Sequence, residues 1–282
     1  MPVQNHWGGS LHSSFQMLTP IASQAATLRA FLGAEGHDKN YVLAHLPYDA
    51  ARAGGRGTGT PNEKRYRDPR QVFQTAGLLY ERADGTMHVT ELGNTAREWL
   101  DIITPRNCHL LGRHAAYALA VCQLRNPTGA GQGYDPAMEV FPFSFIWEAM
   151  LRLDYRISSD ELNRAVFRTG NRGDLAVAIE VIREARETDD PSLMGEPTIT
   201  GDGVNDRIIP WVSIASFGFI MIMDKTESRR AGADTGYYML RPNCVDILEQ
   251  ATRIRHKHRV YASPAEYVER ISRTAALPRD LR

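Results

Sequence analysis

Apolar residues follow a helical period most clearly between positions 65 and 100 of the chain. Val72, Phe73 and Ala76 are spaced so that all three lie on one face of a helix, which we predict over residues 65–76. Gly77 follows directly, and glycine is a typical residue at the end of a helix. This helix is the best-marked element of the first half of the chain.

The residues after this helix predict a tight hairpin. Two short strands are expected at 78–82 and 87–90, and the Asp84-Gly85 pair between them is a common turn signal. Thr90 has the side chain of an N-cap, and the apolar residues after it share one face of a helix that reaches position 100. The order helix, hairpin, helix is the ending of a winged-helix domain.

The residues before position 65 fit the beginning of the same domain. Apolar spacing predicts a helix over 21–32, and Asp38 is expected to cap a second helix that runs to about residue 53. Residues 53–64 hold four glycines, two threonines and a proline, which indicates a loop. The result is the winged-helix order with a lengthened loop before the third helix.

The second half of the chain repeats this order. A long helix at 107–125 is followed by a linker rich in glycine and proline at 126–136. Beyond the linker, the pattern predicts helices at 141–153, 159–168, 174–187 and 206–216, strands at 218–223 and 237–240, and helices at 243–256 and 264–275. Ser158 and Glu161 have the spacing of a capping box at the start of one of these helices.

These elements predict a mainly α fold with short β-hairpins (α+β), arranged as tandem winged-helix-like domains. The expected division is an irregular arm at 1–20, a winged-helix domain with its long helix at 21–125, a linker at 126–136, a second winged-helix-like domain at 137–256 and a helical tail at 257–282. The residue identity between the two halves is low. The prediction of two similar domains therefore rests on their shared order of elements.

Composition narrows the possible function only slightly. The 282 residues are 43% hydrophobic and 23% charged, as in ordinary globular proteins, and the zero net charge does not indicate a general nucleic-acid coat. The widely spaced Cys108, Cys122 and Cys244 are expected to be free thiols in a reducing compartment. Neither an apolar run of membrane-spanning length nor a signal peptide is evident, so we expect a cytoplasmic protein without membrane contact.

Basic residues nevertheless gather between positions 52 and 82. On a winged helix, the third helix enters the major groove with its N-terminal residues at the base edges, and the wing contacts the backbone. We therefore expect double-stranded DNA as the partner, with bases read by Arg65, Arg67, Arg70, Gln71 and Gln74. Phosphates are expected to be held by Arg56, Lys64 and Arg82. The alternative is a solvated polar face on a winged helix that binds another protein.

A second basic group lies at the end of the helix predicted at 243–256 and just after it, with Arg253, Arg255, His256, Lys257, His258 and Arg259. Cations are favoured at the C-terminal end of a helix, so a solvated helix end is the simpler interpretation and phosphate contact the alternative. His256 and His258 are two positions apart and would point to different sides of a helix. Without a further Cys, His or Asp cluster, they predict no metal site.

The usual patterns of catalysis are missing from the sequence. No Asp followed by an Asp/Glu-x-Lys motif suits a metal-dependent nuclease, and no HNH, GIY-YIG or GxSxG pattern is present. The glycine-rich segment at 54–60 lacks the Gly-Lys-Ser/Thr ending of a phosphate loop. We therefore expect no catalytic centre, no cofactor and no metal.

Three segments carry a family resemblance: GLLYERADGTMHVTELGNTA, FPFSFIWEAMLRLDYRISSDELNRAVF and GFIMIMDKTESRRAGADTGYYMLRPNCVDIL. In order and pattern, residues 20–256 resemble the DNA-recognition half of type IIS restriction and nicking endonucleases of the AlwI and FokI kind. The resemblance implies tandem winged-helix subdomains that read an asymmetric duplex site. Because the nuclease domain of that family has no counterpart here, it also implies a nuclease or effector subunit that acts in trans.

Three functions are therefore compared. The first is a sequence-specific DNA-recognition subunit of a bacterial restriction or antiviral defence system. The second is a winged-helix scaffold or protein-interaction subunit, which the zero net charge and the acids mixed into the basic segment would suit. The third is a free-standing transcription regulator, which predicts a dimer on symmetric half-sites, although no long heptad helix is present to drive dimerisation.

Overall fold

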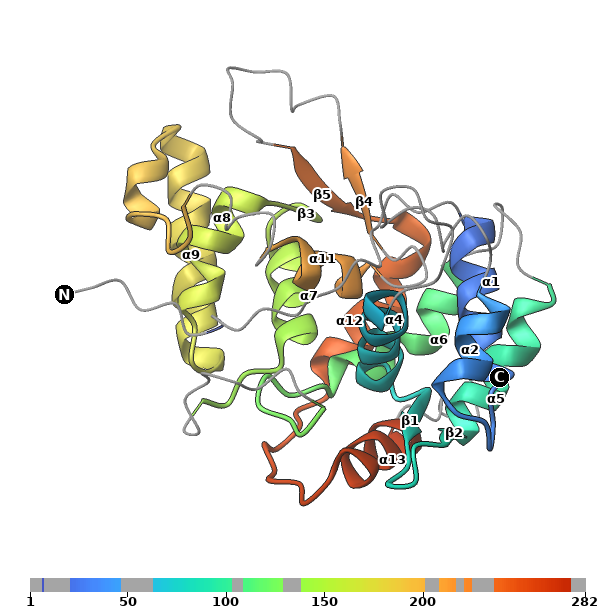
Figure 1. Cartoon of the computed structure of the whole chain (residues 1–282). Helices are drawn as coiled ribbons and strands as arrows, with labels where there is room; N and C mark the ends of the chain where they lie inside the picture. Colours follow the sequence, from blue (N-terminus) through green and yellow to red (C-terminus); the bar gives the residue numbers. More distant parts are fainter. Residues whose placement is uncertain are drawn as a thin grey trace.

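The computed structural model describes residue 7 and residues 21–46, 63–102, 109–128, 138–200, 208–216, 221–224 and 236–274. Helices make up most of this part of the chain, and two small antiparallel sheets complete it (Figure 1). The expected mainly helical α+β fold is therefore confirmed.

The described elements fall into two halves followed by one more helix. The first half contains α1 (Ile21–Leu32), α2 (Lys39–His45), α4 (Glu63–Thr75), β1 (Leu79–Glu81), β2 (Met87–Val89), α5 (Glu91–Leu100) and α6 (His109–Ala120). The second half contains α7 (Pro142–Arg152), β3 (Arg156–Ser158), α8 (Ser159–Arg164), α9 (Arg172–Thr188), α11 (Ile209–Ala215), β4 (Met221–Asp224), β5 (Tyr237–Leu240) and α12 (Val245–Arg253). Short 3-10 turns lie at Val166–Arg168, Pro191–Met194 and Pro242–Cys244, and α13 (Pro264–Thr274) follows.

Most predicted elements are present near their predicted positions. The ends of α1 and β5 agree with the sequence pattern, and α4 begins two residues earlier than expected. The capping box forms, with Glu161 N donating to Ser158 Oγ at 3.1 Å and Ser158 N to Glu161 Oε2 at 2.7 Å. Asp38 caps α2, which ends at His45, and the predicted continuation over 47–53 lies outside the described residues.

Two features of the second half differ from the sequence pattern. The predicted helix at 159–168 ends as α8 at Arg164, because Ala165 has φ −120° and the chain continues as a 3-10 turn. The strand β3 was not predicted. It follows a sharp turn in which Asp154 and Tyr155 have positive φ values of 56° and 61°, a conformation that non-glycine residues seldom adopt.

The first hairpin and α5 are held together at one close approach. Thr90 caps α5 by accepting from Gly93 N at 3.1 Å, and its hydroxyl donates to the carbonyl of Gly77 at 2.7 Å. A Cβ atom at Gly93 would lie only 2.1 Å from the carbonyl oxygen of Leu78. Gly93 therefore lets α5 rest directly on the hairpin backbone.

Both halves have the same strand order. In the first half, β1 pairs with β2, and Glu35 after α1 forms a bridge to Met87 on the other side of β2. In the second half, β3 after α7 pairs with β5, which also pairs with β4. In each half, the residues after the first helix therefore lie beside the second strand of the hairpin.

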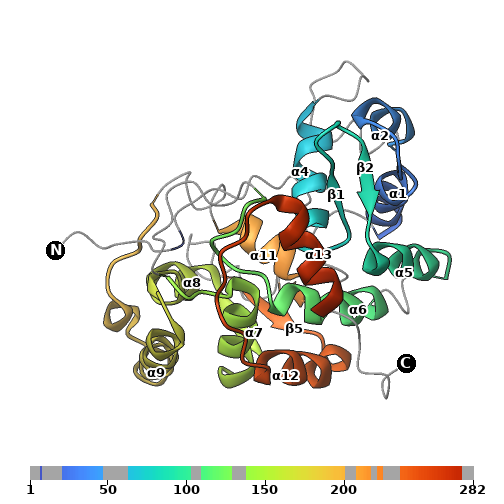
Figure 2. The same cartoon turned by 90° about the horizontal axis from the view of Figure 1, so that it is seen from below.

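The helix α13 packs on the first half, although it follows the second half in sequence. It lies against β1, α5 and α6, as Figures 1 and 2 show. Ser272 Oγ accepts from Leu92 N at 3.2 Å, and Tyr267 OH accepts from Gln123 N at 3.1 Å. The buried apolar residues of both halves and of α13 form one continuous core.

Residue 7 shows where part of the predicted N-terminal arm belongs. Trp7 is 1% exposed, and its indole N–H donates to the carbonyl oxygen of Thr169 at 3.0 Å. Its ring stacks on Phe167 with centroids 4.9 Å apart. This tryptophan is therefore part of the core of the second half.

Candidate nucleic-acid interface

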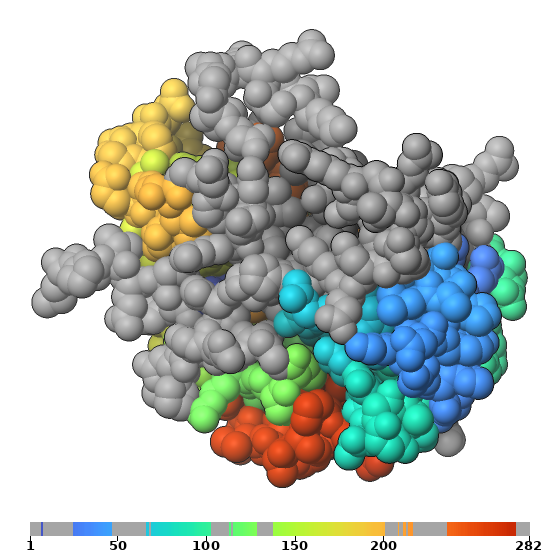
Figure 3. Space-filling view, viewed as in Figure 1, coloured from blue at the N-terminus to red at the C-terminus, as the bar shows by residue number. Residues whose placement is uncertain are grey.

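The N-terminal part of α4 reaches the surface on the first half. Figure 3 shows atoms of α4 at the surface beside those of α1 and α2. The apolar face of the helix is buried, with Val72 at 1% exposure and Phe73 at 0%. The amphipathic pattern therefore fixes which side of α4 a partner could reach.

The predicted base-reading residues differ in their accessibility along this helix. Arg65 lies in the first turn of α4, and Arg67 follows with an exposed side chain. Gln71 is half-buried and Gln74 is 6% exposed. Residues 67, 71 and 74 lie along one side of the helix. This side is exposed at residue 67 and becomes buried toward the C-terminal end of α4. Gln74 therefore lies beneath the surface, whereas Arg67 is open to a partner.

Arg70 connects α4 to the hairpin. Its guanidinium group forms an ion pair with the carboxylate of Glu81 on β1 and lies 5.2 Å above the ring of Tyr66. Tyr66 OH donates to the same carboxylate at 3.2 Å. Burial, followed by the negative charge of Glu81, raises the pKa of Tyr66 to about 12. The charge of Arg70 is thus largely compensated within the protein, and its side chain fixes the angle between α4 and β1.

Arg82 at the hairpin is also paired with a carboxylate. Its guanidinium group lies 2.9 Å from Glu35 Oε1 and 2.8 Å from His88 Nδ1. The second ring nitrogen of His88 lies 3.3 Å from Glu269 on α13. The side chain of Arg82 is 41% exposed, so the pair leaves it accessible at the surface while connecting the hairpin to the segment after α1.

Of the other two residues that were predicted to contact phosphates, only one lies in the described part of the chain. Lys64 lies in the first turn of α4, whereas Arg56 lies outside the described residues. The structure thus brings Arg67, Arg70 and Arg82 to the same half of the molecule but gives carboxylate partners to Arg70 and Arg82. The sequence showed acids near these arginines without showing which of them form pairs.

Metal-binding, reactive-thiol and membrane-spanning features are the other possibilities in the described part of the chain. No cluster of three or more His, Cys, Asp or Glu side chains there could hold a metal ion. Cys122 and Cys244 are buried free thiols, and burial raises the pKa of Cys122 to about 12. Cys108 lies outside the described residues. None of the helices in these ranges is both long enough and apolar enough to span a membrane.

Comparison with known proteins identifies a similar fold. No family model matches the sequence, and no curated protein matches it. The chain is similar in structure to the BpuJ1 endonuclease binding domain, solved in complex with pyrene- and phenanthrene-modified DNA. The TM-score is 0.55 with 12% sequence identity, and the alignment covers 92% of each chain.

This likeness shows a shared fold over nearly the whole chain. It extends across both halves, so the pairing of the two halves belongs to the shared architecture. The similar protein is an endonuclease binding domain, as the sequence resemblance led us to expect in general terms. The narrower resemblance to enzymes of the AlwI and FokI kind is not supported by this match and stays a prediction.

Proposed function

We propose that this chain is a double-stranded DNA-recognition protein of a bacterial restriction or antiviral defence system. The observation that carries the proposal is its fold, which is shared over 92% of each chain with an endonuclease binding domain solved with DNA. The exposed side chain of Arg67 near the start of α4 supports it. Each half is interpreted as a winged helix, because its strand order and its hairpin after a helix suit that fold.

The proposed docking places the start of α4 in the major groove. The base-reading set is then reduced to Arg65, Arg67 and Gln71, since Gln74 is buried. Arg70 acts as a positioning residue, because its pair with Glu81 fixes α4 against the hairpin. Arg56, Lys64 and Arg82 are proposed to contact phosphates.

We further propose that a separate nuclease or effector subunit acts in trans. These 282 residues carry no recognised nuclease motif, and the fold shared with the endonuclease binding domain covers 92% of them. Mixing the purified chain with candidate effector subunits and a duplex that holds its site would test this step. Cleavage that requires both proteins would support the proposal, and cleavage by the chain alone would contradict it.

The DNA-binding proposal is tested by fluorescence anisotropy with a labelled duplex at several salt concentrations. The duplex is first selected from a random library with the wild-type chain. Arg67→Ala should weaken binding about 5- to 150-fold, which corresponds to the 1–3 kcal/mol typical of a base-reading arginine. Arg97→Ala is the control, since Arg97 is an exposed arginine on α5.

Equal affinities of the Arg67→Ala and Arg97→Ala variants would show that α4 does not dock as proposed. A selected library without any shared sequence would contradict specific recognition. Both results are interpretable only if the variants keep the circular dichroism spectrum of the wild type, which exposed positions should preserve.

A protein-binding scaffold is the second candidate function. The carboxylate partners of Arg70 and Arg82 and the zero net charge favour it, because they reduce the positive field around α4. Complete absence of duplex binding by the wild-type chain at low salt would favour the scaffold. The third candidate, a free-standing regulator, requires a dimer, so a monomer in light scattering would contradict it.

A further inference from the structure

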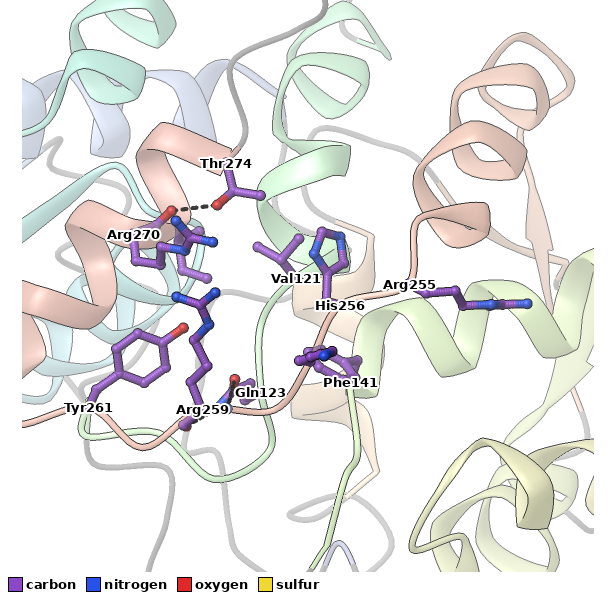
Figure 4. Close-up of a pocket in the computed structure, with 11 residues that line it drawn as sticks. Val121, Gln123, Phe141, Arg255, His256, Arg259, Tyr261, Arg270 and Thr274 are labelled. Carbon is purple, nitrogen blue, oxygen red and sulfur yellow. Dashed lines mark hydrogen bonds between the residues drawn. The ribbon is translucent and has the colours of Figure 1, made fainter.

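The second basic group of the sequence lines a cavity. The segment after α12 runs past the residues that follow α6 and leads into α13, and together they line an open pocket of about 210 Å³ (Figure 4). The lining combines basic side chains from this segment with Arg270 and Thr274 of α13. The sequence did not predict the cavity, because Arg270 is separated from the basic group by the turn that precedes α13.

Gln123 fixes the position of the segment at this cavity. Its side-chain amide donates to the carbonyl oxygen of Arg259 at 2.7 Å and accepts from Arg259 N at 2.8 Å. Gln123 is 2% exposed, and its own backbone N–H donates to Tyr267 OH. The backbone of Arg259 is therefore held at two points by a buried side chain, unlike the backbone of an unsupported helix end.

Two guanidinium groups converge at this place. Figure 4 shows Arg259 and Arg270 with their guanidinium groups turned toward each other, and Tyr261 beside them. Within the described ranges, neither group forms an ion pair with a carboxylate. Arg255 differs, since it lies 3.6 Å from Glu148 and points away from the other two in Figure 4.

Two acidic side chains near the cavity contact other groups. Glu269 lies close to His88 and Arg273, and Glu266 accepts from Ala262 N at 2.7 Å. Both acids line a neighbouring groove, which Arg259 and Arg270 also line, but neither acid lines this cavity. The lining of this cavity contains no carboxylate, so the like charges of the two guanidinium groups repel each other on this side. An anion between them would relieve the repulsion.

His256 provides an unsatisfied polar atom in the cavity wall. Its Nε2 is buried without a hydrogen-bond partner among the described residues. Burial, together with the positive charges of Arg172 and Arg270, lowers the pKa of His256, so the ring is favoured in its neutral form. An anion bound beside the ring would balance the positive charges of the neighbouring arginines, and its binding would change the electrostatic environment of His256.

We propose that the cavity binds a phosphate group between the guanidinium groups of Arg259 and Arg270, beside His256. Guanidinium groups match the geometry of phosphate oxygens, and a pair of them can hold one phosphate from two sides. The site is separate from α4. The phosphate has two possible sources, the backbone of a bound duplex or a free phosphate compound, and the second source does not depend on the proposed function.

Inorganic phosphate is the probe for the first test. The histidine ring signals of the full chain are followed by NMR during a phosphate titration at constant ionic strength, with chloride as the exchanged anion. The wild type should show saturable binding that shifts the His256 signal. Arg259→Gln combined with Arg270→Gln should weaken this binding at least about tenfold.

Arg273→Gln is the matched control, because Arg273 lies one turn beyond Arg270 on α13 and does not line the cavity. It should leave phosphate affinity unchanged. Absence of saturable binding in the wild type would overturn the proposal. Equal losses in the control and in the double variant would also overturn it, since general surface charge would then explain the binding.

Duplex DNA identifies the source of the phosphate. If the backbone supplies it, a saturating duplex should displace inorganic phosphate, and the double variant should lower the salt slope of duplex binding by about 2, one for each lost cation. If a free compound supplies it, phosphate should still bind in the presence of duplex, and duplex affinity should not change in the double variant. Failure of the α4 docking would leave the phosphate titration unaffected, so the two proposals fail independently.

Discussion

The helix directly before the hairpin has different surroundings in the two halves. In the first half this helix is α4, and its N-terminal part exposes Arg67. In the second half it is α11, where Trp211, Val212, Ile214 and Ala215 are buried. The same order of elements therefore presents a polar helix end in one half and an apolar helix inside the core in the other.

The strand after the first helix also differs between the halves. In the second half it is β3, which forms a regular ladder with β5. In the first half a single bridge at Glu35 takes its place, reinforced by the contacts of the Glu35 carboxylate with Arg82, His88 and Val89 N. The backbone pairing in the first half is thus shorter and parallel, with Gly36 N donating to Met87 O at 2.9 Å and Met87 N to His37 O at 2.8 Å, and the Glu35 side chain adds to it.

An arginine and glutamate pair joins a helix to its neighbours in each half, and the two pairs differ in burial. The pair of Arg70 and Glu81 in the first half has side chains 29% and 28% exposed. The pair of Arg186 and Glu161 in the second half is 15% and 5% exposed. Arg186 also donates to two backbone carbonyls at 2.8 Å, so the second pair is the more deeply buried and the better satisfied.

The largest expected effect is a difference in the stability that is lost when each of these two pairs is broken. Glu161→Gln should lower the free energy of unfolding by about 3–5 kcal/mol, because it leaves the buried charge of Arg186 without a counter-ion. Glu81→Gln should cost only about 1 kcal/mol, since water can reach Arg70. Urea denaturation of both variants measures the difference. Equal losses would show that the two pairs are alike in spite of their different burial.

A smaller effect is expected where the first hairpin rests on α5. Gly93→Ala should lower the free energy of unfolding by about 1–3 kcal/mol, because the new methyl group meets the carbonyl of Leu78. The neighbouring exposed Asn94→Ala is the control and should stay within about 0.5 kcal/mol of the wild type. Thermal denaturation compares the two. A Gly93→Ala protein as stable as the control would mean that α5 can move away from the hairpin without cost.

The smallest effect concerns the bridge that replaces β3 in the first half. Partial burial raises the pKa of Glu35, but the hydrogen bonds from Val89 N and His88 and the charges of His88 and Arg82 lower it below its ordinary value of 4.5. A carboxylate with a lowered pKa in the folded state stabilises the protein above the unfolded-state pKa and loses this contribution as the pH falls through the folded-state pKa.

Glu35→Gln should therefore be less stable than the wild type at neutral pH and equally stable in acid well below pH 4.5. The loss should be small, because the Glu35 side chain is 45% exposed and solvent screens its charge. Urea denaturation at several pH values measures it. A difference that persists at low pH would assign the role of Glu35 to packing instead of charge.

The local signals in the sequence predicted most elements of this fold. Thr90 as a cap, Gly77 at a helix end and the capping box of Ser158 and Glu161 act within a few residues, so they can be identified without tertiary information. The strand β3 could not be predicted in this way. It has three residues, and only its pairing with β5, some 80 positions later, makes it a strand.

The candidate sites, like the fold, were predicted only in part from the sequence. The sequence determined that basic residues gather at the start of α4 and after α12, because charge and helical period are local properties. Only the tertiary structure decided that Gln74 is buried, that Glu81 and Glu35 pair with Arg70 and Arg82, and that Arg270 joins Arg259 at one cavity. The physical reason is that burial and charge pairing depend on residues distant in sequence, which only packing brings together.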